Sequence, residues 1–359
     1  MDPASVDPGA AAARIRAEIA AGGSIAFDRF MQLALYEPGG YYEHPPIGPG
    51  GDFVTSPHVH PVFGELLARG LRELYGHLGR PEPFRLVEVG GGDGTLARQL
   101  LEHLSDLPLS FSAVEASAGA RKRLRQIPGI EVVDSIGDDP HVVLGHELLD
   151  NLPFRLIHGA SEVRVSVRAG RFVRVEVPVE DDLAAVIGSA GDAEEHAVPT
   201  EALRLIDDLA RILRRGYAMF VDYGGETGGG PVHGYRGHRL VEDVLAAPGA
   251  TDITAGVDFA VLAAAATARG LRAFPRVDQL RALSVLGFEG WMRGELATQG
   301  SLLNRGDGME AVRRWAGRSR ASILVDPGRL GRLRWFGLAS PGLPRPSFLA
   351  PEGEDPRAD

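Results

Sequence analysis

The residues best suited to chemistry follow a short apolar run, where an acid is succeeded by glycines at alternate positions. Glu88, Gly90, Gly92 and Gly94 give the pattern E-x-G-x-G-x-G. Glycines let the backbone turn tightly and approach a bound ligand closely. Such a loop after the first strand of a parallel sheet is typical of a site for a nucleotide-like cofactor. We therefore predict that these four residues belong to a cofactor site.

The spacing of this loop discriminates between cofactors. A dinucleotide loop has the pattern G-x-G-x-x-G, and here the third glycine is out of that register. The acid at the strand end together with the alternating glycines instead resembles the E/D-x-G-x-G-x-G signature of class I S-adenosylmethionine (SAM) methyltransferases. Glu115 ends the next predicted strand and can accept hydrogen bonds from both hydroxyls of a ribose. Ser117 follows it and joins the predicted cofactor residues. SAM is the predicted cofactor, and NAD or a turn without a ligand are the alternatives.

Two further carboxylates, Glu147 and Asp150, follow the apolar run that ends near residue 145. Ligands of open parallel sheets bind outside the carboxyl ends of the strands, so we expect both side chains to face the cofactor. Methyl transfer is an in-line displacement in which positioning of the acceptor does most of the work. Paired carboxylates can orient a guanidinium acceptor. We predict a catalytic role for both residues; the alternative is that they only favour the N-terminal end of a helix.

Strands and helices alternate over residues 84–145, with predicted strands at 84–89, 109–115, 130–133 and 141–145. This alternation predicts an α/β fold with a doubly wound, mostly parallel, Rossmann-like sheet. Residues 10–36 have the apolar spacing of a helix. Residues 162–177 alternate apolar and polar side chains around Ala169-Gly170, which predicts a β-hairpin inserted into the core.

The composition excludes several classes of function. The 359-residue chain is 44% hydrophobic, carries a formal net charge of −10 and has no cysteine. This charge argues against a general nucleic-acid binder, and the absence of cysteine excludes disulfides and a thiolate nucleophile. Neither a signal sequence nor an apolar run of membrane-spanning length is evident, so we expect a cytoplasmic protein. His58 and His60 are expected at the surface or as helix caps, and no metal site is predicted.

Several separated segments, spread over residues 24–340, carry a family resemblance. They include Gly51-Asp52-Phe53-Val54-Thr55-Ser56-Pro57, the glycine loop, Glu147-Leu148-Leu149-Asp150, Asp222-Tyr223-Gly224 and Asp252-Ile253-Thr254. Together they resemble the MidA family of SAM-dependent methyltransferases, which includes a mitochondrial complex I assembly factor that methylates a protein arginine.

The resemblance implies roles for the first of these segments. Its loop is expected to approach cofactor and acceptor, with Asp52 in a catalytic role and Thr55 and Ser56 at the cofactor. The chain departs from the family pattern at His58, where an acid is usual, and at His146, where an asparagine is usual.

The resemblance also implies a function and a domain plan. We expect transfer of a methyl group to a protein side chain, first of all an arginine nitrogen, in a protein partner such as a respiratory-complex subunit. The alternatives are a small-molecule O- or N-methyltransferase of secondary metabolism and a SAM-binding assembly factor that acts by binding a partner. The predicted parts are a helical segment with the Gly-Asp-Phe loop (1–80), a SAM-binding core with a hairpin at about 155–180 (81–345), and a disordered tail (346–359).

Overall fold

The computed structural model describes residues 8–43, 54–180, 195–225, 231–237 and 239–354. Asp52 therefore lies outside the described residues. In the described part, the largest sheet has the strand order β16-β18-β10-β5-β2-β3-β4, with β17 also paired to β18. We call it the main sheet. Its strands are β2 (Phe84–Val89), β3 (Leu109–Val114), β4 (Ile130–Val133), β5 (Val142–His146), β10 (Tyr217–Asp222), β16 (Arg272–Ala273), β17 (Val277–Asp278) and β18 (Arg334–Ala339).

The strands from β4 to β10 are parallel, and β18 is antiparallel to β10. Helices cover both faces, so β10 is buried along its whole length. Its alternate residues Tyr217 and Met219 face the core beneath α4 (Val62–His77), α5 (Thr95–His103) and α10 (Gln279–Val285). Ala218 and Phe220 face α8 (Thr200–Ile212) and α9 (Phe259–Ala268). The predicted doubly wound α/β fold is confirmed.

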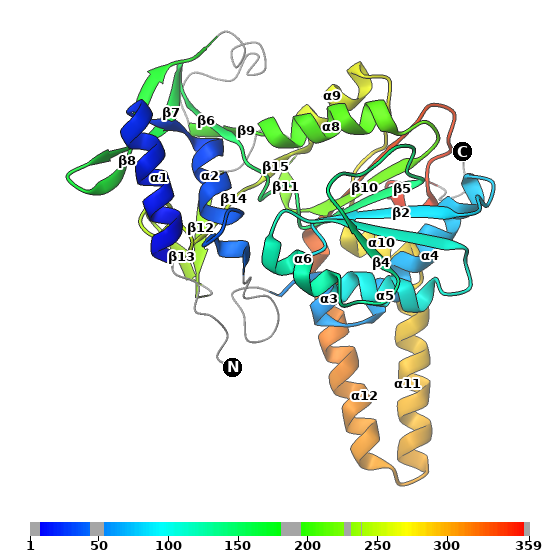
Figure 1. The fold of residues 1–359 in the computed structure, drawn as a ribbon. Helices are drawn as coiled ribbons and strands as arrows, with labels where there is room; N and C mark the ends of the chain where they lie inside the picture. Colours follow the sequence, from blue (N-terminus) through cyan, green and yellow to red (C-terminus); the bar gives the residue numbers. More distant parts are fainter. Residues whose placement is uncertain (1–7, 44–53, 181–194, 226–230, 238, 355–359) are drawn as a thin grey trace.

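A second body of the molecule, which we call the accessory lobe, has its own apolar core (Figure 1). Its antiparallel sheet contains β1 (Ile25–Ala26), β6 (Arg155–His158), β7 (Ser161–Arg168), β8 (Arg171–Pro178) and β9 (Glu195–Val198). The predicted hairpin is the β7–β8 pair, and it belongs to this larger sheet. The helices α1 (Pro8–Gly22) and α2 (Phe27–Leu35) pack against it, as does the small sheet of β12 (Val232–Arg236), β13 (Arg239–Val241) and β14 (Asp252–Ala255).

Residues 10–36, predicted to be helical, form two helices, α1 and α2, with the short strand β1 between them. Gly23 adopts a positive φ of 80°, which ends α1 because other residues disfavour that conformation. The next two residues form β1, which pairs with β7 of the accessory sheet. The interruption lets the chain enter α2 at a different angle, with Phe27 and Phe30 fully buried in the lobe.

Two helices form a projecting hairpin that the sequence patterns do not predict as a unit. α11 (Phe288–Asn304) and α12 (Gly308–Ala321) extend away from the main sheet (Figure 1). We call this hairpin the helical arm. Its base packs on the main body, where the Trp291 ring lies 5.0 Å from the ring of His60. In the described residues, none of the helices is long and apolar enough to cross a membrane.

The expectation of a disordered tail is wrong for the described residues just after 345. Ser347–Leu349 form a short 3-10 helix, and Phe348 and Leu349 are buried. Phe348 makes an edge contact with Trp335, whose ring lies 5.7 Å away. The prolines and acids of this segment suggested disorder, but its few apolar side chains complete the main core.

Candidate functional site

A cavity of about 620 Å³ opens at the carboxyl ends of β2 and β5, and the glycine loop forms one of its walls. Gly90, Gly92 and Gly94 all have positive φ, which lets the chain turn sharply between β2 and α5. A Cβ atom on Gly90 would lie 2.9 Å from Leu148 Cδ1. Gly94 does not line the cavity; a Cβ atom there would lie 2.2 Å from Ile127 Cδ1, so this glycine permits close packing behind the loop.

The two predicted cofactor carboxylates both line this cavity. Glu88 is buried, and its Oε2 has no hydrogen-bond partner among the described residues. Burial, reinforced by Glu115 and Asp93, raises the pKa of Glu88 to about 8. Glu115 accepts hydrogen bonds from the backbone N–H of Gly92 at 3.0 Å and of Ser117 at 2.9 Å. A turned glycine loop, an orphan buried carboxyl oxygen and a ribose-type acid together fit SAM.

Ser117 lies behind this wall and does not line the cavity. It is fully buried at the N-cap of α6 (Ala118–Leu124), where its Oγ accepts the Ala120 N–H at 3.3 Å. The same Oγ donates a hydrogen bond to the Tyr42 carbonyl at 2.7 Å. Ser117 thus links Glu115, at the end of β3, to Tyr42. A direct contact of Ser117 with the cofactor stays a prediction.

Thr55 begins a hydrogen-bonded chain that the sequence did not predict. Its Oγ1 lies 2.8 Å from His58 Nδ1, and His58 Nε2 lies 2.9 Å from Asp93 Oδ2. Burial alone would raise the pKa of Asp93, but hydrogen bonds from His58 and Thr95 hold it below its usual range. His58 therefore joins α3 (Ser56–Val59) to the glycine loop.

Ser56 is placed deeper than its neighbour Thr55. Its side chain is fully buried and lies 3.2 Å from Gln279 Nε2, away from the residues that line the cavity. Its backbone N–H points to Glu147 Oε1 at 3.4 Å. Ser56 therefore positions a carboxylate of the site, and a direct contact with the cofactor stays a prediction.

The predicted catalytic pair Glu147 and Asp150 lines the cavity directly after β5. Glu147 has a positive φ of 48°, held by a hydrogen bond from its N–H to the Val221 carbonyl at 2.8 Å. Burial and the nearby Asp150 raise the pKa of Glu147 to about 8. Asp150 Oδ2 accepts the Thr254 hydroxyl at 2.9 Å, and its Oδ1 has no partner among the described residues. Both acids can therefore receive a cationic group.

A third carboxylate, Asp222, supports this pair from the end of β10. Its Oδ2 accepts the backbone N–H groups of Leu148 at 2.9 Å and Leu149 at 2.6 Å. The side chain is completely buried, and burial together with the neighbouring Asp150 raises the pKa of Asp222. Asp222 thus fixes the loop that carries both predicted catalytic residues.

The accessory lobe supplies the opposite wall. Tyr36 and Tyr42 line the cavity with their rings stacked at 5.4 Å, and the Tyr42 hydroxyl donates to Asp252 Oδ1 at 2.8 Å. Successive side chains of a strand point to opposite faces. Accordingly, Asp252 and Thr254 of β14 line the cavity, while Ile253 is buried in the lobe core. The motif Asp252-Ile253-Thr254, one of the segments that carry the family resemblance, therefore belongs to this wall.

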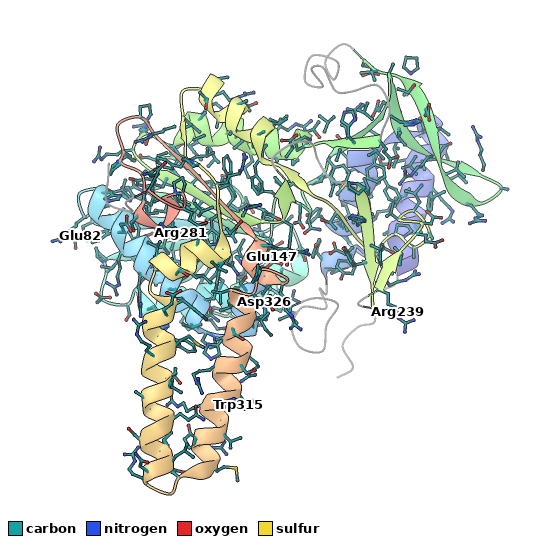
Figure 2. All side chains as sticks on the ribbon, turned by 180° about the vertical axis from the view of Figure 1, so that it is seen from behind. Glu82, Glu147, Arg239, Arg281, Trp315 and Asp326 are labelled. Atoms are coloured by element: carbon teal, nitrogen blue, oxygen red, sulfur yellow. The ribbon has the colours of Figure 1, made fainter. Side chains whose placement is uncertain are left out.

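His146, where the family usually has an asparagine, also lines the cavity. Its ring packs edge-on against Phe63 at 5.0 Å, and burial lowers the pKa of His146 to about 3. Its Nδ1 lies 3.7 Å from Glu147 Oε1. A neutral imidazole therefore lies beside the Glu147 carboxyl group and brings no positive charge that would compete with a cationic acceptor. Figure 2 places Glu147 between the main body and the accessory lobe.

Comparisons with known proteins agree with this site. Residues 66–276 match the family described as "Putative S-adenosyl-L-methionine-dependent methyltransferase". The "Protein arginine methyltransferase NDUFAF7 homolog, mitochondrial" of Drosophila melanogaster is 31% identical over 314 residues, which cover 73% of this chain and 71% of that protein. The "Protein arginine methyltransferase NDUFAF7, mitochondrial" of Danio rerio is 29% identical over 296 residues, covering 69% of this chain and 70% of that one.

A solved structure is similar along nearly the whole fold. It is a Burkholderia thailandensis protein bound to S-adenosyl-homocysteine, with a TM-score of 0.79 and 28% sequence identity, covering 94% of this chain and 93% of that chain. The demethylated cofactor in that relative agrees with SAM and not with the NAD alternative. The chain belongs to this family of SAM-dependent methyltransferases, and SAM is its cofactor.

Proposed function

We propose that this methyltransferase modifies an arginine side chain of a protein. The observation that carries the proposal is the pair of largely buried carboxylates, Glu147 and Asp150, on the cavity wall beside the glycine loop. A guanidinium is always cationic and matches carboxylates in a bidentate geometry. The fly and zebrafish relatives are both named protein arginine methyltransferases, which supports the same acceptor.

The chain's residues divide the work between holding the reagent and orienting the acceptor. Glu88, Glu115 and the glycine loop would hold SAM, which supplies a methyl group on a positively charged sulfur that leaves as a neutral thioether. Glu147 and Asp150 hold the guanidinium so that one nitrogen lone pair points at the methyl carbon. The new nitrogen–carbon bond replaces the sulfur–carbon bond, and the proton released from that nitrogen passes to the carboxylate of Glu147.

A cationic acceptor also explains how the Glu147 carboxyl group can be negatively charged when the acceptor is bound. Burial makes the free carboxyl of Glu147 retain its proton up to about pH 8. A guanidinium within hydrogen-bond reach favours the charged carboxylate and lowers that pKa. A neutral small-molecule acceptor offers no such compensation, which favours arginine over the O-methyltransferase alternative.

The test is transfer of tritiated methyl groups from SAM to the proteins of an extract from cells that lack this gene. We expect ω-methylarginine in the acid hydrolysate of the labelled protein. Glu147→Gln is expected to abolish labelling while SAM binding in calorimetry stays unchanged. Glu131→Gln, at an exposed residue of β4, is the control that keeps both. Label confined to the protein-free filtrate, or to other amino acids, would exclude the proposal.

The finer assignments are also proposals. A respiratory-complex subunit is the first purified acceptor to assay, as the family resemblance implies, and a cytoplasmic location stays a prediction. If a Glu147→Gln variant that binds SAM rescues a strain lacking the gene, the chain acts by binding a partner and transfer is dispensable.

A further inference from the structure

The helical arm has an unusual distribution of polar and apolar side chains. The contacts between α11 and α12 are polar at two levels: Arg314 donates to Glu295 Oε1 at 2.9 Å, and Arg318 donates to the side chain of Gln299. The outer half of the arm buries only Leu302 and Ala311. Five large apolar side chains on the same two helices are exposed, namely Leu296 55%, Leu303 56%, Met309 72%, Val312 61% and Trp315 57%.

Helix geometry puts four of these side chains on one side of the arm. Each comes directly after a residue that faces the other helix; the pairs are Glu295 and Leu296, Leu302 and Leu303, Ala311 and Val312, and Arg314 and Trp315. One step along a helix is a rotation of about 100°. Because the two helices are antiparallel, the same rotation leads to the same side of the hairpin on both. We call this side, together with Met309 at the tip of the arm, the apolar face; Met309 is three residues before Val312 and so lies about 60° from it around α12.

The other side of the arm has the opposite character. The residues directly before the same four contact positions are Gly294, Ser301, Glu310 and Arg313. They are small or polar, so the arm is apolar on one side only. Single exposed apolar residues are ordinary, but four on one side of a two-helix projection, with Met309 next to them at the tip, form a patch that marks an interaction surface. Figure 2 shows Trp315 midway along the arm, remote from Glu147.

We propose that the apolar face binds the same face of a second copy of this chain. With about 100 Å² exposed on each of the five side chains, one face presents roughly 500 Å². Two copies therefore bury about 1,000 Å², which reaches the lower bound of specific protein interfaces.

Charge and symmetry favour the same occupant. The five side chains of the apolar face are all uncharged, so a two-fold axis brings no like charges together there. Two such hairpins face to face make a bundle of four helices around Leu, Val and Trp side chains, which is a stable way to bury apolar stripes. The contacts between α11 and α12 are largely polar, so a second copy would complete an apolar core around the arm.

The experiment is sedimentation velocity of the full chain across the micromolar concentration range, beside light scattering. We expect a dimer that dissociates on dilution, and a dissociation constant at least about tenfold higher for Trp315→Glu and for Leu303→Glu. Ser301→Glu, on the other side of α11, is the matched control and is expected to dimerise like the natural chain. Circular dichroism melting of each variant separates loss of the interface from loss of the fold.

A second readout uses the tryptophan itself. Trp335 is fully buried, whereas Trp315 is 57% exposed and is expected to move into an apolar environment on association. The fluorescence emission therefore shifts to shorter wavelength as the concentration rises, and Trp315→Phe removes that shift while the dimer remains. The proposal is overturned if the chain is a monomer at every concentration, or if both glutamate variants dimerise like the natural chain. If the chain is a monomer and Trp315→Glu prevents methylation of the protein acceptor, the face binds that acceptor and not a second copy. The oligomeric state is measured without SAM, so this result is independent of the proposed reaction.

Discussion

Asp222 Oδ2 lies 2.6 Å from the backbone nitrogen of Leu149, so a side chain at the end of β10 holds the loop that follows β5. The same oxygen accepts the N–H of Leu148, and Asp222 Oδ1 accepts the N–H of Tyr223 at 2.8 Å. Adjacent parallel strands end at the same edge, which lets one side chain serve both loops. Asp222 positions Glu147 and Asp150 without lining the cavity itself.

We expect Asp222→Ala to release this loop. Buried N–H groups left without an acceptor cost about 1–3 kcal/mol of the free energy of unfolding, and misplacement of the acceptor lowers kcat about 100-fold. Urea denaturation and the tritium transfer assay measure the two effects. The control is Asp258→Ala, which removes a carboxylate that accepts two backbone N–H groups at the start of α9. Equal turnover of the two variants contradicts a positioning role for Asp222.

Gly90→Ala tests the glycine loop against a control with the same backbone conformation. Gly90 and Gly170 both have φ of 76°, so both substitutions bring the same backbone strain. Only at Gly90 does a Cβ atom meet a neighbour, Leu148 Cδ1, whereas nothing lies within 4 Å at Gly170. We expect Gly90→Ala to weaken SAM binding at least about tenfold and Gly170→Ala to leave it unchanged, as measured by titration calorimetry. Equal affinities would show that the loop does not contact SAM.

Glu147→Gln is expected to stabilise the protein, and by more at high pH. The pKa of Glu147 is raised from 4.5 to about 8 by burial, so the unfolded chain ionises first as the pH rises. The free energy of unfolding therefore falls between about pH 4.5 and pH 8, because the unfolded chain loses this proton freely whereas the folded chain holds it at a buried position. Glutamine carries no proton to lose and avoids this cost. Thermal melts at pH 5 and pH 8 are expected to show a higher Tm for the variant, with the larger difference at pH 8. A difference independent of pH contradicts the raised pKa.

His58→Ala is expected to weaken SAM binding about fivefold, because the glycine loop loses its hydrogen bond to α3. The matched control is His158→Ala. Its Nδ1 also lies 2.9 Å from a carboxylate, Glu176, but this pair is exposed on the accessory sheet. Calorimetry with SAM is expected to separate the two variants, and identical affinities would remove His58 from the site.

The sequence predicts well what depends on neighbours along the chain. The strand 84–89, the glycine loop and the pair Glu147 and Asp150 all lie where their local patterns placed them, because each follows from spacing within about ten residues. It could not predict partners that only tertiary folding brings together. Tyr42 and Asp252 are separated by 210 positions, yet their side chains share a hydrogen bond.

The helical arm was missed for a related reason. Its contact positions are part polar, at Glu295 and Arg314, and its large apolar residues are mostly exposed beside them, so residues 288–321 lack the single stripe that marks a helix packed on a core. The prolines and acids of the tail indicate disorder, but Phe348 and Leu349 bury it in the main core, with Phe348 against Trp335.

The cavity's two walls belong to bodies with separate cores. The glycine loop depends on the main sheet, whereas Tyr36 and Tyr42 pack against the core of the accessory lobe. Under the proposed function, we expect substitutions in the accessory-lobe core that spare the hydrogen bond between Ser117 and the Tyr42 carbonyl to alter acceptor choice and to leave SAM binding intact. Such a division would help the enzyme to evolve. Substitutions in one lobe could give a new protein acceptor while every intermediate variant still binds SAM.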